Sequence, residues 1–335
     1  MDSLSQIVLG AACGEAVLGR KVGNKALLWG AIGGTIPDLD VILQPLFHPV
    51  DGLFVHRGYS HSLIFAFFAA PVFGWLIHKL YKGKHASFRE WTLLMFFSIF
   101  THPLLDAFTG YGTPLFLPFS DYRVDINSVF IIDPLYTLPL AFSLIMVMRA
   151  RNNIALRRKW NRLGLILSCG YLAFTLVNQQ VMSRTFTRAL EKEGIAYTRH
   201  MSYPTPFNNI LWGFIAETEN GYYMSYRSWF DTSDVQFSFV PSNKALIEEM
   251  KADERVQKLI TFSKGYYCIT QDGQELCFSD IRFGKAGGWS LEEADFVFSF
   301  MVRKDPQGRP VFERGAWQKA RMSSLSSLWK RIKGV

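Results

Sequence analysis

Histidine and aspartate residues recur in this sequence at the ends of its apolar segments. The stretch HRGYSHS supplies His56, Arg57 and His61 directly before a long apolar run. Ionisable groups at the edge of a membrane are costly, so they are usually either functional or held in a protected pocket. Several such residues at one depth would therefore indicate a functional site.

Two further motifs carry the same residue types. In TIPDLD, Asp38 and Asp40 follow an apolar segment, and Pro37 disfavours a continued α-helix, so we expect this pair on a turn. In THPLLD, His102 and Asp106 are four residues apart, so a helix presents both on one face. These motifs and HRGYSHS together supply imidazoles and carboxylates from separate segments.

This set of side chains suits a divalent metal ion. Imidazole and carboxylate ligands favour zinc, with manganese or iron as alternatives, and the motifs contain no cysteine for a thiolate site. The predicted ligands or immediate neighbours are Asp38, Asp40, His56, His61, His102 and Asp106. The candidate catalytic residues are Asp38, Asp40 and Arg57, because a carboxylate can act as a general base and a guanidinium can bind an anion. The number of ions stays open.

Each residue also has a purely structural interpretation. A single histidine at a membrane edge is more often an anchor, and His102 with Asp106 could form a salt bridge. Asp133 precedes Pro134 and could be a helix N-cap or a part of the site. The shared location of these residues favours the site for the group more than for any single member.

Composition divides the chain into two parts. With 49% hydrophobic and 19% charged residues, the chain of 335 residues is apolar for a soluble enzyme but too charged to be membrane throughout. We expect a polytopic membrane domain over residues 1–182 and a soluble domain over residues 183–335. Crossing a bilayer takes about 20 apolar residues. Six predicted membrane helices cover residues 4–19, 26–43, 60–78, 91–108, 129–148 and 163–182.

The turns between these segments predict the orientation. Lysine and arginine gather in residues 20–25, 79–89 and 149–162, which contain no acidic residue. Basic turns face the cytoplasm, so the metal-binding motifs and the second domain are expected on the outer face. The net charge of +8 resides largely in these turns. We therefore expect membrane lipids, and not nucleic acid, as partners.

The second domain has the pattern of β-strands, with alternating apolar and polar residues. Its Asp272–Gly273 pair is a strong hairpin signal. A two-residue loop there would place Cys268 opposite Cys277, where either a disulfide or two free thiols could result. The predicted fold class is an α-helical membrane domain of about six helices followed by a β-rich (α+β) extracytoplasmic domain.

The end of the chain has the pattern of an amphipathic helix. Apolar residues near helical spacing, with basic residues between them, are Trp317, Leu325, Leu328, Trp329 and Ile332. Such a helix could lie on an anionic membrane surface. We expect instead that it packs on its own domain.

Five motifs occur in an order that resembles a known family. They are MDSLSQIVLGAACGEA, WGAIGGTIPDLDV, HRGYSHSLIF, THPLLDAFTGYGTPLFLPFS and FIIDPLYTLPL. Together they resemble the YdjM-type membrane-bound metal-dependent hydrolases, over essentially the whole chain. The resemblance implies a multi-pass protein of the bacterial inner membrane whose His and Asp motifs hold metal. More distantly, this family is similar to zinc phospholipase C and P1 nuclease, whose HxxxD step is matched by His102 and Asp106.

One position departs from the family pattern. Members commonly begin with Met-Asp followed by Thr-His, whereas this chain has Ser5 and Gln6. An amide is a poor zinc ligand compared with imidazole. Either this position lies outside the ligand set, or one metal site is weakened or lost.

The sequence predicts a membrane-bound metal-dependent hydrolase with its site at the outer face of the inner membrane. A phosphoester in a lipid or envelope precursor is the expected substrate, by analogy with the family. One alternative is a transporter or metal-handling protein, and another is an envelope assembly factor with a structural metal. A transport route needs polar residues through the full depth of the membrane, whereas these motifs gather on one side. Protein partners and oligomeric state stay open.

Overall fold

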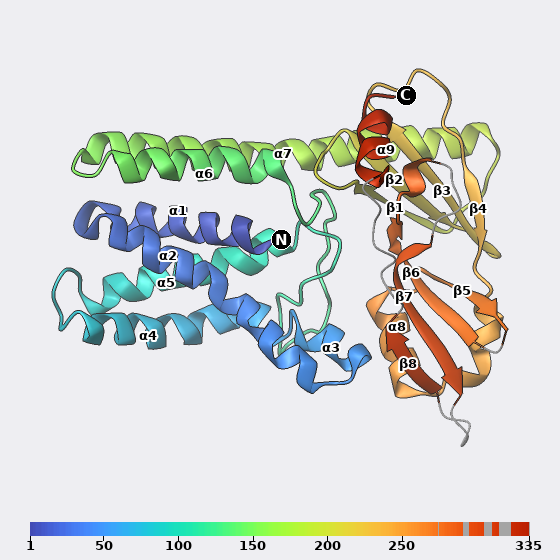
Figure 1. The fold of residues 1–335 in the computed structure, drawn as a ribbon, viewed down its shortest axis with the longest axis horizontal. Helices are drawn as coiled ribbons and strands as arrows, with labels where there is room; N and C mark the ends of the chain where they lie inside the picture. Colours follow the sequence, from blue (N-terminus) through green and yellow to red (C-terminus); the bar gives the residue numbers. More distant parts are fainter. Residues whose placement is uncertain (274, 291–294, 305–309, 315–322, 335) are drawn as a thin grey trace. The chain divides into compact units, whose positions relative to one another are not determined.

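The computed structural model describes residues 1–334 except 274, 291–294, 305–309 and 315–322. The chain forms two compact units, which are described separately. Unit 1 comprises residues 1–43, 55–178 and 206–208, and unit 2 comprises residues 44–54, 179–205 and 209–335. Unit 1 is helical, whereas unit 2 contains the β-strands (Figure 1).

Unit 1 consists of apolar helices that lie side by side (Figure 1). Each of the six predicted apolar segments contains a helix, but residues 129–133 of the fifth segment are not helical. The helices are α1 (Ser3–Val22), α2 (Asn24–Thr35), α4 (Leu63–Leu80), α5 (Phe88–Asp106), α6 (Pro134–Arg149) and α7 (Ile154–Lys192). Within the described residues, three helical stretches are long and apolar enough to cross a membrane: Asn24–Leu46, Leu63–Leu80 and Ile154–Lys192. Helix α6 is apolar but shorter, and six membrane crossings stay a prediction.

The long helices of unit 1 alternate in direction, so the loops between them fall at two ends (Figure 1). The three basic turns share one end, where Lys21 contacts Glu90 at 2.7 Å and Arg157 donates to Asn24 Oδ1 at 2.7 Å. The opposite end contains the 3₁₀ helices η1 (Ile36–Leu46) and η2 (Tyr59–His61) and the C-terminal end of α5. Basic turns and metal-binding motifs are therefore separated along the helices.

Asp38 and Asp40 lie in η1, and the predicted turn is wrong. The α-helix does end at Thr35, but the chain continues in 3₁₀ conformation through both aspartates. Proline is tolerated at the start of a helix because the first amide groups have no intrahelical partner. Pro37 is the second residue of η1, so the α-helix ends before it while the chain continues as a 3₁₀ helix.

Glycines allow α1 and α2 to approach each other at backbone distance. A Cβ atom on Gly10 would overlap the carbonyl oxygen of Gly30, and one on Gly14 would overlap that of Ala26. Small residues at such contacts are how helices associate where lipid replaces water. Because each obstacle is backbone, no side-chain rotation can relieve it. This contact fixes α2, which leads directly into Asp38.

Unit 2 contains two antiparallel sheets of four strands each, both with strands in sequence order. The first has β1 (Arg199–Pro204), β2 (Leu211–Glu217), β3 (Gly221–Ser228) and β4 (Ser238–Pro241), and the second has β5 (Tyr267–Asp272), β6 (Glu275–Lys285), β7 (Phe296–Lys304) and β8 (Pro310–Arg314). Shorter helices are α3 (Pro49–Val55), η3 (Lys244–Met250), α8 (Glu254–Phe262) and η4 (Gly288–Ser290). The β-rich α+β character of the second part is confirmed.

The predicted pairing of Cys268 with Cys277 is wrong. Strands β5 and β6 pair with Cys268 opposite Ser279 and Cys277 opposite Thr270, and both cysteines are free. The loop starts at Gly273, one residue later than predicted, where φ is 58°. Glycine adopts this left-handed conformation without strain. Moving the loop by one residue shifts every cross-strand partner by two.

The C-terminal helix α9 (Ser323–Ile332) packs on unit 2, as expected. Leu328 and Ile332 are buried beside Leu211, and Arg331 donates from both terminal nitrogens to the carboxylate of Asp231 at 2.5 Å. Burial opposes ionisation of Asp231, but Arg331 outweighs it and lowers the pKa of Asp231. The predicted helix residue Trp317 lies outside the described residues.

We expect Gly10→Ala to weaken unit 1. The added methyl group must separate α1 from α2, which should destabilise the protein by about 1–3 kcal/mol, the usual effect of overpacking. Gly170→Ala is the matched control, because nothing lies within 4 Å of a Cβ on this helical glycine. Thermal unfolding of the full chain in detergent should show a lower midpoint for Gly10→Ala only. Equal midpoints in the two variants would contradict the close contact.

Candidate metal centre

Four side chains from three segments converge at the end of unit 1 opposite the basic turns. Asp38 comes from η1, His61 from η2, and His102 and Asp106 from the last turns of α5. One donor atom of each lies within 4.8 Å of all the others. Three of the residues are buried, and only the Asp38 side chain is partly exposed, at 18%. This group could hold a metal ion.

The spacing of the donor atoms matches that of ligands around one cation. His61 Nε2 lies 3.3 Å from Asp38 Oδ1 and 3.4 Å from Asp106 Oδ2. His102 Nε2 lies 3.4 Å and 3.6 Å from the same two oxygens, and 3.2 Å from His61 Nε2. Ligands at about 2.0–2.1 Å from a tetrahedral ion are about 3.3–3.4 Å apart. These five separations are compatible with a single shared ion.

The partners of the two imidazoles indicate which nitrogens are lone-pair donors. His102 Nδ1 lies 2.6 Å from the carbonyl oxygen of Gly34, which can only accept, so this nitrogen carries the proton. His61 Nδ1 lies 3.2 Å from Asp40 Oδ2, which fixes the same tautomer. In neutral rings with these tautomers, the lone pairs of the two Nε2 atoms face each other, an arrangement that a bound cation would stabilise.

Asp106 supplies a second sign of a cation. Its Oδ2 atom is buried and has no hydrogen-bond partner among the described residues. Its Oδ1 atom accepts from the Met1 amine, from Gln6 Nε2 at 3.0 Å and from Arg57 at 3.2 Å. A buried carboxylate oxygen without a partner is costly, so a positive ion at the centre would complete this residue.

Asp40 and His56, which the sequence also suggests as ligands, lie one contact further out. Asp40 accepts from the backbone amide of Arg57 at 3.1 Å and from Ser60 Oγ at 2.5 Å, and contacts His56 Nδ1 at 2.8 Å. Its remaining contact is with His61 Nδ1. Asp40 therefore orients His61, and His56 in turn holds Asp40. Neither side chain belongs to the group of four.

Arg57 lies beside the centre in a constrained conformation. Its φ of 57° is uncommon for a non-glycine residue, and its side chain is buried. The guanidinium donates to Thr109 Oγ1 at 3.1 Å and to Asp106 Oδ1, and stacks over Tyr111 at 4.8 Å. Its Nε atom has no hydrogen-bond partner among the described residues. Such an anchored donor is suited to hold an anion next to a cation.

Two other predicted residues have structural positions. Asp133 is the N-cap of α6, where its Oδ1 accepts from the amides of Leu135 and Tyr136, and Pro134 is the first helical residue. Gln6 Nε2 donates to Asp106 Oδ1 at 3.0 Å, so the position that departs from the family pattern contacts a member of the group of four.

Sequence reasoning missed the groups that hold the ligands in place. The carbonyl of Gly34, Ser60 and Thr109 all contact the donor set or its neighbours. Ser60 lies within HRGYSHS and could have been found there as a partner for a nearby carboxylate. A backbone carbonyl leaves no signal in side-chain identity.

We expect purified protein to contain about one divalent cation per chain, because one set of four donors is present. Asp106→Asn should lose most of this metal, since the amide cannot offset the charge of the ion. His85→Asn is the matched control, because His85 is exposed at the opposite end of unit 1 and its φ of 77° is tolerated by asparagine. Elemental analysis of both variants checks this. Full metal content in Asp106→Asn would exclude the centre.

Comparison with known proteins places the first part of the chain in a family. The YdjM inner membrane protein family matches residues 1–182. "Uncharacterized protein YfhP" of Bacillus subtilis (strain 168) is 24% identical over 308 residues, which cover 86% of this chain and 88% of that protein. "Inner membrane protein YbcI" of Escherichia coli (strain K12) is 34% identical over 109 residues, 32% of this chain and 61% of that protein. No solved structure matches significantly. The chain belongs to the YdjM inner membrane protein family.

Proposed function

We propose that this protein is a metal-dependent hydrolase of the bacterial inner membrane that cleaves a phosphoester at the outer face. The observation that carries the proposal is the group of Asp38, His61, His102 and Asp106, with two opposed imidazole nitrogens and an unpartnered carboxylate oxygen. Nitrogen and oxygen donors of this kind suit zinc, with manganese or iron as alternatives. When bound, such a cation supplies Lewis acidity and activates water.

The residues around the donors have separable roles in this proposal. Asp38 is the most exposed of the four, so substrate would approach from its side. The buried guanidinium of Arg57, which Thr109 and Asp106 hold in place, would supply positive charge for a phosphoryl group at the centre. Asp40 keeps His61 in the tautomer that leaves Nε2 unprotonated, and we assign it as a positioning residue.

The membrane supplies the expected substrate. The family is one of inner membrane proteins, and unit 1 exposes large apolar side chains on its long helices, among them Phe68, Leu138 and Ile166. Its basic turns share one end and the metal centre lies at the other. With basic turns in the cytoplasm, the centre would lie at the outer boundary, next to lipid headgroups. A lipid or an envelope precursor with a phosphoester is the substrate class that this location favours.

Activity should depend on the donor set. We expect purified protein to hydrolyse a generic phosphodiester or a phospholipid, and His102→Ala to lower the rate by about 100-fold or more, since the loss of a ligand removes the cation. His85→Asn should retain the rate. Product release with and without a chelator, followed by re-addition of metal, measures this. Bound metal with no hydrolysis of either substrate would contradict the enzymatic proposal and leave the metal centre standing.

Orientation is tested by labelling single cysteines in a background without the native ones. Lys82→Cys lies in a basic turn, and Ser233→Cys lies at an exposed position of unit 2. On intact spheroplasts, an impermeant maleimide should label Ser233→Cys and leave Lys82→Cys unlabelled until the membrane is permeabilised. The reverse pattern would place the metal centre in the cytoplasm.

A second function is favoured by the number of donors. Catalytic zinc sites usually have three protein ligands and an open position, whereas structural sites have four. Four donors at mutual distances of 3.2–3.6 Å for the pairs given above also suit a structural ion. An envelope assembly factor with such an ion would lose stability on chelation and would show no hydrolysis.

A further inference from the structure

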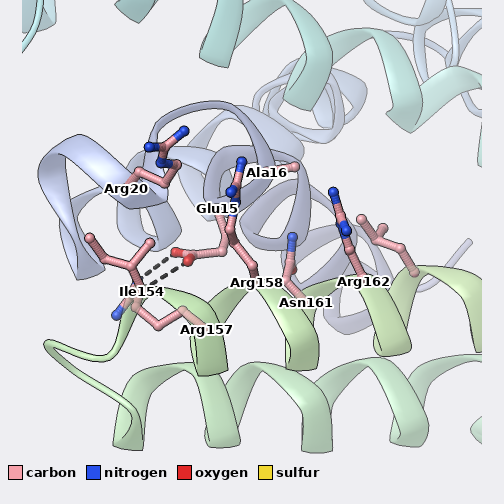
Figure 2. A pocket seen from close by; sticks show the side chains of 9 residues that line it. Glu15, Ala16, Arg20, Ile154, Arg157, Arg158, Asn161 and Arg162 are labelled. Atoms are coloured by element: carbon pink, nitrogen blue, oxygen red, sulfur yellow. Dashed lines mark hydrogen bonds and ion pairs between the residues drawn. The ribbon is translucent and has the colours of Figure 1, made fainter.

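A cavity lies in unit 1 between α1 and α7, among the basic turns and remote from the metal centre (Figure 2). Its volume of about 130 Å³ is roughly ten times what one water molecule requires. The polar side chains that line it are Glu15 and Arg20 from α1 and Arg157, Arg158, Asn161 and Arg162 from α7. None of these belongs to the proposed active site.

The single acidic residue of the cavity is already neutralised. Arg157 Nε donates to Glu15 Oε1 at 2.9 Å and its NH2 group donates to Oε2 at 2.5 Å, and both side chains are almost fully buried. Arg157 also donates to Asn24 Oδ1 at 2.7 Å. Figure 2 shows this pair bridging the two helices. The pair therefore joins α1 to α7 and leaves no net charge of its own.

The remaining arginines give the cavity a strong positive charge. Arg20, Arg158 and Arg162 also line it, and none of them forms an ion pair within the described part of the chain. One glutamate against four arginines leaves three positive charges around one small cavity. Guanidinium groups match the oxygens of a phosphate in geometry and charge. An anion with several oxygens would therefore be bound here.

Two further features favour a lipid headgroup as the source of that anion. Ile154 and Leu165 also line the cavity, and the exposed apolar side chain of Ile166 lies one helical turn beyond Arg162 on α7. Acyl chains could contact these side chains while the phosphate sits among the arginines. In addition, Asn161 Oδ1 is buried with no hydrogen-bond partner among the described residues. It can accept from a hydroxyl or ammonium group next to the phosphate.

We infer that this cavity binds the phosphate group of an anionic phospholipid from the leaflet that faces the basic turns. Basic pockets between membrane helices on the cytoplasmic side are suited to such headgroups, because that leaflet carries negative charge. The bound lipid would join α1 to α7 at the protein surface, whereas the buried Glu15–Arg157 pair joins the same helices in the interior. The assignment of the leaflet rests on the proposed orientation, whereas binding itself does not.

The test uses the full chain in neutral detergent. Short-chain phosphatidylglycerol, short-chain phosphatidylcholine and inorganic phosphate are each titrated, and bound lipid is counted by native mass spectrometry alongside the thermal midpoint. We expect phosphatidylglycerol to bind and to raise the midpoint, and phosphatidylcholine to bind at least tenfold more weakly. Arg158→Gln with Arg162→Gln should weaken phosphatidylglycerol binding by roughly 25-fold, from the usual effect of one basic residue on anionic lipid.

Lys82→Gln with Lys84→Gln is the matched control, because it removes the same charge from a basic turn outside the cavity. If the control binds phosphatidylglycerol within twofold of the original protein, the result supports a specific site in the cavity. Equal losses of affinity in both double variants would show that the lipid binds through general surface charge, and would overturn the proposal. Inorganic phosphate that competes as well as the lipid would reject the lipid as the source. The metal content should be unchanged in both double variants. A loss of lipid binding with full metal content therefore concerns the cavity alone and leaves the proposed hydrolase untouched.

Discussion

Two carboxylates and two imidazoles, held together in a buried space, impose the constraint on which the candidate metal centre depends. Two imidazole nitrogens lie 3.2 Å apart, and each faces carboxylate oxygens at 3.3–3.6 Å. One of those oxygens has no donor among the described residues. In a low-dielectric site such an arrangement repels itself unless positive charge lies between the donors. The donors are kept at this spacing by the packing of the helices, by the backbone carbonyl of Gly34 and by a second layer of side chains, namely Gln6, Asp40 and Arg57.

Neighbouring groups occupy the other polar atom of three of the four candidate ligands. The carbonyl oxygen of Gly34 accepts from His102 Nδ1, Asp40 Oδ2 lies beside His61 Nδ1, and Asp106 Oδ1 accepts from the Met1 amine, Gln6 and Arg57. The remaining atoms of these three residues, two Nε2 and one Oδ2, face one another and Asp38 Oδ1.

Unit 1 separates its candidate metal centre from its basic turns. The four candidate ligands lie at one end, while the basic turns and the arginines of the cavity lie at the other. Two acidic residues at the basic end are paired, Glu15 with Arg157 and Glu90 with Lys21. Paired charge can be tolerated at membrane depth, whereas unpaired charge belongs at the water interface. The same separation underlies the proposed orientation of the protein in the membrane.

The sequence by itself determined the helical segments, the metal-binding motifs and the strand-rich second part, because these follow from period, composition and local spacing. It predicted His102 and Asp106 on one helix face, since four residues make about one turn. It could not decide which of Asp38, Asp40 and His56 reach the centre, because that depends on how η1 and η2 meet α5. Nor could it determine the register at Cys268, where one residue in the loop changes every pairing. Only the tertiary structure decided these points, because contacts between distant segments are set by packing and not by neighbours in the chain.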